Sequence, residues 1–178
     1  MKKILQAKDI NFRFAEISDA EFILSLRVDT RYNQHLSQVD SSIAEQIKWL
    51  EKYKVRENKG EEFYFIIQRN MDNKPIGTVR LYDFIKNESS FCWGSWILNE
   101  NKPPKAAVQS AVLIYEYAFY KLGFNRSHFD VRKENTGVIN FHLRFGAKQI
   151  GSTEDDILFY FYKSEYEINR PNYLLDFM

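Results

Sequence analysis

The sequence predicts a mixed α/β fold in which most strands pair antiparallel and one pair is parallel. Segments of strand and helix character follow one another in the order β, α, α, β, β, β, α, β, α, β, β. Short turns join several successive strands, and strands joined in this way can pair only antiparallel. One long helix separates the strand at Trp96 from the strand at Phe129, and a crossover of this kind makes its two strands parallel.

The bulk composition indicates a globular protein with one core. A length of 178 residues falls within the roughly 100 to 200 residues of a typical domain, so residues 1–178 are expected to form a single domain. Hydrophobic residues make up 44% and aromatic residues 16%, enough to fill a core and line a cleft. The net charge of +1 gives no overall attraction to nucleic acid or a membrane, so neither is expected as a partner.

Compartment and metal content are predicted from what the chain lacks. The N-terminal residues MKKILQAKDI contain no apolar run long enough for a signal peptide, and no stretch approaches the roughly 18 apolar residues of a membrane span. A cytoplasmic location is therefore expected. The single cysteine, Cys92, cannot form an internal disulfide, and no Cys/His cluster has zinc spacing, so no metal is expected.

The N-terminal part of the chain predicts one strand and two helices. Alternation of apolar and polar residues over 10–15 predicts a half-buried strand. A capping box at Ser18 to Glu21 predicts the start of a short helix, and a second one at Ser42 to Glu45 predicts a helix to about Arg56. The second helix is expected to bury one apolar face, formed by Ile43, Ile47 and Leu50.

The middle of the chain predicts a three-stranded meander and then a long helix. Residues 62–69, 75–84 and 90–98 are rich in aromatic and β-branched residues and are separated by turns. Pro103 and Pro104 suit the first turn of a helix that runs to about Leu122. Gly123 is expected to end that helix in the left-handed conformation.

The last third of the chain predicts a strand, a helix and a closing hairpin. Residues 128–132 form the strand, Asn135 or Thr136 caps the helix, and Gly146 ends it. Ile150 and residues 157–162 suggest the hairpin, and a short helix is expected from Tyr166 onward. The apolar stripe of the capped helix consists of Val138, Phe141 and Phe145.

Two local patterns resemble the GNAT superfamily of acetyl-CoA-dependent N-acetyltransferases. The first is the strand, loop and long helix of FCWGSWILNENKPPKAAVQSAVLIYEYAF. The second is the strand, Asn, helix and Gly of FDVRKENTGVINFHLRFGA, which is similar to the family pattern N-x-x-A-x-x-x-Y-x-x-x-G-F. The resemblance covers about residues 12–162. It implies a GNAT-like fold, with a mostly antiparallel central sheet, a splayed parallel strand pair and helices on both faces.

The resemblance also implies where acetyl-CoA binds. The family's pyrophosphate loop reads Arg/Gln-x-x-Gly-x-Gly/Ala, whereas this chain has KPPKAA over 102–107 and lacks the Arg and the central Gly. A helix start still offers free amides and positive charge, although an ordinary surface helix fits the same residues. The expected phosphate-binding residues are Lys102, Lys105, Ala106, Ala107 and Val108. The resemblance further implies that the backbone of Trp96, Ile97 and Leu98 pairs with the pantetheine arm and that Asn135 contacts the coenzyme.

His142 aligns with the tyrosine that often protonates the leaving thiolate in this family. A histidine is a competent general acid near neutral pH. Without the resemblance, His142 would be interpreted as a half-exposed helix residue beside the apolar stripe. A backbone N–H near Ile97 is expected to stabilise the oxyanion. Spacing does not distinguish a base among His35, Glu88 and Asp83, and water or His35 is favoured over the two acids, which fit solvated turn residues.

The acceptor is expected to bind to the segment between the first two helices, residues 27–40, and to the closing hairpin. This segment carries donors next to aromatic residues, and arginines bind phosphates well. Its candidate substrate-binding residues are Arg27, Arg31, Asn33 and His35. Together with the later Q-x-x-W-L pattern, the segment looks like that of amino-sugar acetyltransferases of surface polysaccharide pathways. A solvated loop is the alternative interpretation.

These patterns support three hypotheses about function. The leading one is transfer of an acetyl group from acetyl-CoA to the amine of a nucleotide-linked amino sugar by direct attack. The second is a protein N-terminal acetyltransferase of the ribosomal-protein type. The third is a non-catalytic CoA-binding or scaffold module, because the pyrophosphate glycines are missing. A homodimer is considered as the assembly.

Overall fold

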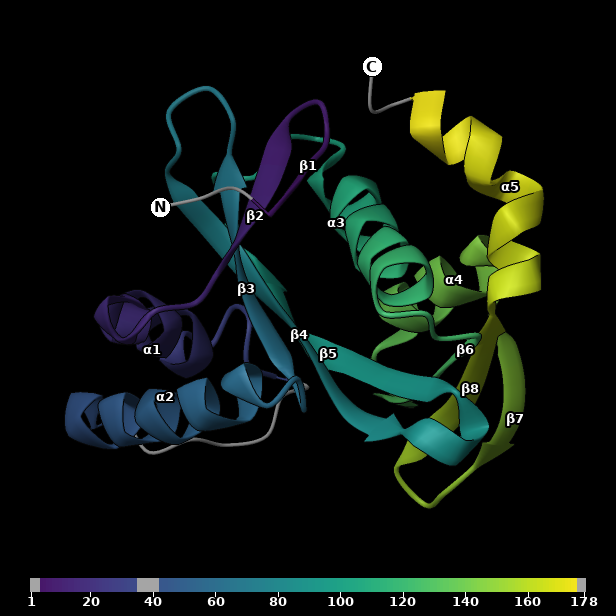
Figure 1. The fold of residues 1–178 in the computed structure, drawn as a ribbon, viewed down its shortest axis with the longest axis horizontal. Coiled ribbons are helices and arrows are strands. Elements are labelled where there is room, and N and C mark those ends of the chain that lie inside the picture. The colour runs from purple at the N-terminus through teal and green to yellow at the C-terminus, as the bar shows by residue number, and fades with distance from the viewer. Residues whose placement is uncertain (1–3, 35–41, 176–178) are drawn as a thin grey trace.

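A computed structural model describes residues 4–34 and 42–175 of the chain. Its strands form one eight-stranded sheet in the order β1-β2-β3-β4-β5-β6-β8-β7 (Figure 1). The strands are β1 (Leu5–Gln6), β2 (Ile10–Phe14), β3 (Phe63–Arg69), β4 (Pro75–Ile85), β5 (Ser90–Leu98), β6 (Arg126–Arg132), β7 (Lys148–Ser152) and β8 (Asp156–Tyr162). The helices are α1 (Ala20–Val28), α2 (Ile43–Asn58), α3 (Ala106–Tyr115), α4 (Thr136–Phe145) and α5 (Lys163–Leu175). The predicted mixed α/β class is confirmed.

One parallel contact joins the two halves of the sheet. Strands β5 and β6 pair in parallel only at Ser90 with Arg126 and at Phe91 with Ser127, while every other neighbouring pair is antiparallel. Beyond Phe91 the two strands separate, as Figure 1 shows. The predicted splayed pair is therefore present, and it leaves one edge of β5 unpaired along most of its length.

The sheet carries a hydrophobic core on each face because strand side chains alternate between faces. On β3, Phe65 and Ile67 belong to the larger core, which also contains residues of α3. The neighbouring Tyr64 and Ile66 belong to a second core with residues of α1 and α2. Helices consequently cover both faces of the sheet (Figure 1).

Local capping signals located two of the helix starts and two helix ends correctly. Ser42 caps α2 by accepting from the Glu45 amide at 3.4 Å, and Asn135 caps α4 by accepting from the Val138 amide at 3.3 Å. Gly123 and Gly146 have φ of +81° and +104°, the left-handed conformation expected after a helix.

Other helix predictions were wrong in detail. The first capping box is formed by Glu16 and Asp19, ahead of the predicted one, and it precedes a short 3-10 turn that leads into α1. On α2 the side chain of Ile43 is exposed, and the buried residues are Gln46, Leu50 and Tyr53. The two prolines lie before the long helix, which begins at Ala106 and continues after Tyr115 as a π-helical segment over Glu116–Lys121.

Candidate active site

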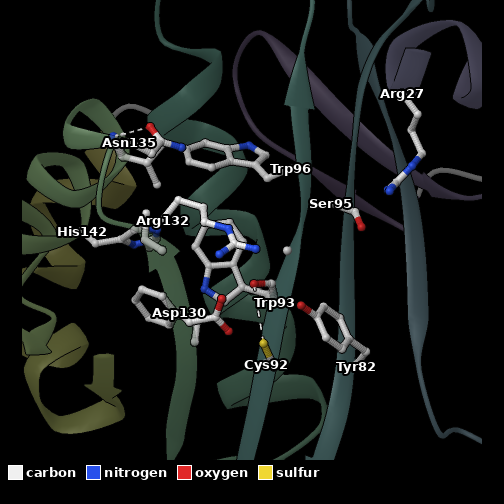
Figure 2. Close-up of a pocket in the computed structure, with 14 residues that line it drawn as sticks. Arg27, Tyr82, Cys92, Trp93, Ser95, Trp96, Asp130, Arg132, Asn135 and His142 are labelled. Carbon is white, nitrogen blue, oxygen red and sulfur yellow. Dashed lines mark hydrogen bonds between the residues drawn. The ribbon is translucent and has the colours of Figure 1, made fainter. Parts of the chain in front are cut away.

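A cavity of about 340 Å³ opens where β5 and β6 separate. Figure 2 shows Arg27 reaching toward it from one side and His142 from the other, with Trp93 between them. The cavity is lined by Arg27, Tyr82, Cys92, Trp93, Gly94, Ser95, Trp96, Phe129, Asp130, Val131, Arg132, Asn135, Val138 and His142. Residues from both halves of the sheet and from two helices therefore meet here.

The backbone of β5 is shaped by a bulge beside this cavity. The pairing register with β4 shifts between Thr78 and Arg80, and Ser95 adopts φ of +48°, as in bulges whose first residue is left-handed. The Thr78 hydroxyl donates to the Ser95 carbonyl oxygen at 2.9 Å and holds the bulge. This irregularity turns the following residues of β5 relative to those before it.

After the bulge, alternate peptide groups of β5 face β4 or the open edge. The Asn99 amide donates to the Ile76 carbonyl, and the Ile97 carbonyl lies against Gly77 of β4. Because hydrogen-bonding groups alternate along an antiparallel strand, the backbone groups of Trp96 and Leu98 face the open side. Two of the three residues predicted to pair with the pantetheine arm thus present free backbone groups there, whereas Ile97 is engaged with β4.

His142 lies deep in the cavity wall on α4. Its side chain is only 4% exposed, so the half-exposed alternative is wrong. The ring packs 4.3 Å from that of Phe129 and 5.3 Å from that of Trp93, centroid to centroid. Burial lowers the pKa of the imidazole to about 3, so the ring is neutral at neutral pH. Its Nδ1 atom is buried and has no hydrogen-bond partner within residues 4–34 and 42–175.

Two further predicted residues line the same side of the cavity. Asn135 lies at the start of α4, where its capping bond holds the side chain at the cavity rim (Figure 2). The Trp96 indole N–H donates to the Ser110 hydroxyl of α3 at 3.0 Å, which fixes the ring between α3 and α4. Both side chains are therefore preorganised by the fold.

The start of α3 differs from the predicted donor set in one respect. The Ala106 amide donates to the Pro103 carbonyl at 3.0 Å, so it closes a turn before the helix. Ala107 and Val108 follow in the first helical turn, where amides have no partner within the helix. Lys102 and Lys105 are exposed beside them. An anion would thus be bound by the amides of Ala107 and Val108 together with these lysines.

The structure brings only Arg27 of the described predicted acceptor residues to the cavity. Arg31 forms ion pairs with Asp29 at 2.6 Å and Glu100 at 3.6 Å and lies outside the cavity lining. The Asn33 amide donates to the Asp29 carbonyl in a turn, also outside the lining. His35 lies outside the described residues.

Glu88, predicted as a possible base, is not at the cavity. It lies in the turn before β5, where its carboxylate forms an ion pair with Arg126. Asp83, the other acid considered, pairs with the imidazole of His128 at 3.1 Å. Both acids therefore pair with side chains of β6 outside the cavity lining, and the geometry does not support either as the base.

Several residues that line the cavity were not singled out from the sequence. Asp130 and Arg132 lie on β6 and are exposed, alternating with the buried Phe129 and Val131. The alternation of exposed and buried residues over 129–132, beyond the part of β6 that pairs with β5, is the signal that would have located them. Tyr82 of β4 pairs with Cys92 on the neighbouring strand β5. Burial raises the pKa of the Cys92 thiol to about 12, so the thiol stays protonated.

Neither a membrane-spanning helix nor a metal-binding cluster occurs in the part of the chain that the structure describes. Within residues 4–34 and 42–175, no helix combines the length and the apolar character needed to cross a bilayer. The same residues contain no group of three or more His, Cys, Asp or Glu side chains placed to hold a metal ion.

Residues 9–148 match the family model described as an acetyltransferase (GNAT) domain. The probable N-acetyltransferase YjcK of Bacillus subtilis (strain 168) is 29% identical over 160 residues, which cover 86% of this chain and 88% of that protein. A solved structure of apo FdhC, described as a nucleotide-linked sugar GNAT, is 49% identical with a TM-score of 0.91, covering 98% of each chain. Spermidine N-acetyltransferase from Vibrio cholerae in complex with CoA and spermine shares the fold at 17% identity, with a TM-score of 0.76 over 89% of this chain and 98% of that one.

The family match spans the sheet from β2 to the start of β7 and includes every described residue that lines the cavity. It also includes the loop before α3 and the cap of α4, the two places where the chain resembles acetyltransferases locally. The chain therefore belongs to the GNAT acetyltransferases and is an acetyl-CoA-dependent N-acetyltransferase.

Proposed function

We propose that the enzyme acetylates the amino group of a nucleotide-linked amino sugar. The observation that supports this most is the 49% identity to a nucleotide-linked sugar GNAT over 98% of both chains. The lining of the cavity agrees with such an acceptor, because it combines the cations of Arg27 and Arg132 with the carboxylate of Asp130. A sugar that carries phosphates and an amine needs both kinds of partner.

The donor side of the cavity fits acetyl-CoA. The open edge of β5 offers the backbone of Trp96 and Leu98 for strand-like pairing, and the α3 start offers amides and two lysines for phosphates. Acetyl-CoA supplies the activated acetyl thioester. The backbone N–H of Trp96 or Leu98, in place of that of Ile97, is positioned to donate toward the open side and to stabilise negative charge on an acyl oxygen.

His142 is proposed to carry the proton from the amine to the sulfur. In direct attack, the N–C bond forms and the C–S bond breaks, the amine loses one proton and the sulfur gains one. A neutral imidazole has one N–H and one lone pair, so it can accept the first proton and donate its own. Burial keeps the ring neutral at rest, and the relay needs a neutral ring. An imidazolium has no free lone pair and could not accept the proton of the amine.

Replacing His142 tests this role. His142→Phe keeps a ring of similar size in the aromatic wall but removes both nitrogens. We expect kcat to fall by on the order of 10² to 10⁴, the usual range for losing acid–base catalysis, with little change in acetyl-CoA affinity. Steady-state kinetics and calorimetric titration with acetyl-CoA measure the two quantities. An unchanged kcat would leave His142 with a packing role only.

The acceptor is tested by following thiol release with a panel of amines. The panel contains nucleotide-linked 3-amino and 4-amino sugars, the same sugars without the nucleotide, and peptides with free N-termini. We expect turnover with at least one nucleotide-linked sugar and a much higher KM for the sugar alone. Turnover with peptides only would refute the proposal and favour the N-terminal acetyltransferase hypothesis.

A further inference from the structure

Two arginines from different elements share one buried carboxylate near the cavity. Arg56 at the end of α2 and Arg80 on β4 contact Glu62 at 3.0 and 3.3 Å, respectively. The Glu62 side chain is 7% exposed, whereas those of Arg56 and Arg80 are 35% and 23% exposed. One negative charge thus faces two positive charges, and these three side chains carry a net positive charge at a half-buried position.

Aromatic rings hold the two guanidinium groups in place. Arg80 stacks over the ring of Tyr82 at 4.4 Å and over that of Trp49 at 5.3 Å. Arg56 lies 5.5 Å from the same Trp49 ring. Such stacking leaves the edges of a guanidinium group available as hydrogen-bond donors. The Nε atom of Arg80 is buried and has no hydrogen-bond partner within residues 4–34 and 42–175.

The arginine cluster adjoins the acceptor side of the cavity. Tyr82, on which Arg80 stacks, lines the cavity, and its hydroxyl lies close to Gly94 of β5. Arg27 of α1 lines the same cavity (Figure 2). Burial raises the pKa of the Tyr64 hydroxyl, and the charges of Arg27 and Arg80 both oppose that rise. Both cations therefore lie near one hydroxyl group, on the same side of the sheet.

We infer that Arg80, Arg56 and Arg27 form the site for the diphosphate of the acceptor nucleotide. This inference rests on the proposed function, in which the acceptor carries such a group. Planar guanidinium groups bind phosphate oxygens in pairs, and a diphosphate supplies the negative charge that the shared carboxylate leaves uncompensated. The acetyl-CoA phosphates are assigned to the α3 start, so the two anions bind at different places.

The structure itself provides a matched control. Arg170 of α5 stacks over Tyr120 at 4.4 Å and pairs with Glu116 at 2.7 Å. Its environment thus resembles that of Arg80, since both arginines stack on an aromatic ring and pair with a carboxylate. The difference is that no second arginine contacts Glu116 within residues 4–34 and 42–175. A purely structural role for a stacked arginine should therefore show equally in Arg80 and Arg170 variants.

The experiment measures binding of dTDP and UDP by calorimetry in the presence of saturating CoA, which blocks the donor site. Compared with the wild type, Arg80→Met should weaken nucleotide binding by about 10- to 100-fold, the range for a lost charge-assisted hydrogen bond. Arg80→Lys should give a smaller loss, because it keeps the charge without the planar fork. Arg170→Met should leave nucleotide affinity unchanged, and CoA affinity, measured separately, should be the same in all proteins.

Two results would overturn the diphosphate site. The first is that Arg80→Met and Arg80→Lys bind the nucleotides with the same affinity as the wild type. The second is that the wild type does not bind dTDP or UDP at millimolar concentration. If Arg80→Met does not fold, Arg80→Lys and Arg56→Met carry the test. The proposed function fails separately, when nucleotides bind through Arg80 but no nucleotide-linked amino sugar is acetylated. Unchanged KM in Arg80 variants during sugar acetylation would reject the site alone.

Discussion

The burial of His142 couples the active site to the stability of the protein. Its imidazole is enclosed by Phe129, Trp93 and neighbouring rings, and burial lowers its pKa from about 6.5 to about 3. Between these two values the unfolded chain binds a proton that the folded protein does not bind. Above about pH 6.5 proton binding to His142 therefore does not reduce the unfolding free energy. As the pH falls from there toward 3, the unfolding free energy decreases, because only the unfolded chain gains the proton.

We expect this histidine to cost the wild type about 2 kcal/mol of unfolding free energy between pH 7.5 and pH 5. His142→Phe lacks the titrating group, so its unfolding free energy should fall less over the same interval. Urea denaturation of both proteins at the two pH values measures the difference, and the carboxylates common to both cancel. Parallel pH dependences would show that the ring is not held neutral by burial.

At the scale of single residues, the sequence located some site positions and missed others. The register of the strand, Asn, helix and Gly pattern located Asn135 and His142, because it is contained in about twenty consecutive residues. Arg80, which we propose to bind the acceptor diphosphate, was missed, because its partners Glu62 and Trp49 lie on other elements, and only the folded sheet brings them together. His142 burial was missed for the same reason, since β5 and β6 supply most of the enclosing rings.

At the scale of elements, Gly77 controls the distance between β4 and β5. A Cβ atom added there would lie 2.1 Å from the Ile97 carbonyl oxygen, a backbone atom that cannot move alone. Gly77→Ala should therefore push the two strands apart, lower the unfolding free energy by about 1 to 3 kcal/mol or more, and raise KM for acetyl-CoA because the binding edge of β5 shifts.

Gly151 of β7 is the matched control, because a Cβ there would make an ordinary contact of 3.8 Å with Leu158. Gly151→Ala should leave KM for acetyl-CoA unchanged and should not destabilise the protein. Thermal unfolding and acetyl-CoA kinetics of the two variants make the comparison. A Gly77→Ala enzyme with normal stability and KM would show that the contact between β4 and β5 is not needed at the site.

The boundaries of helices were predicted correctly where hydrogen bonds between neighbouring residues set them, and wrongly where other causes did. Caps and left-handed glycines were predicted because their hydrogen bonds join residues three or four apart. The start of α3 was misplaced because the Pro103 carbonyl accepts from Ala106 in a turn before the helix, an arrangement that proline in the first helical turn also satisfies. The π-helical segment after Tyr115 carries no comparable signal in the sequence.

At the scale of the whole molecule, β3 holds two cores together. Phe65 and Ile67 face the core that contains Trp93 and the residues of α3, while Tyr64 and Ile66 face the core beside α1 and α2. If β3 leaves the sheet, the hydrophobic residues of both cores become exposed to solvent. The two cores are thus expected to unfold as one cooperative unit, as the prediction of a single domain requires.

The three tryptophans allow this to be measured, since Trp49 packs against the second core while Trp93 and Trp96 belong to the first. In a Trp93→Phe/Trp96→Phe protein, fluorescence follows Trp49 alone, and in Trp49→Phe it follows the other two. Within each variant the urea midpoint by fluorescence should equal that by far-UV circular dichroism, because two-state unfolding gives coincident transitions. A lower fluorescence midpoint for Trp49 alone would mean that α1 and α2 detach first. The proposed acceptor site, which includes Arg27 and Arg56 on those helices, would then form only after the rest of the fold.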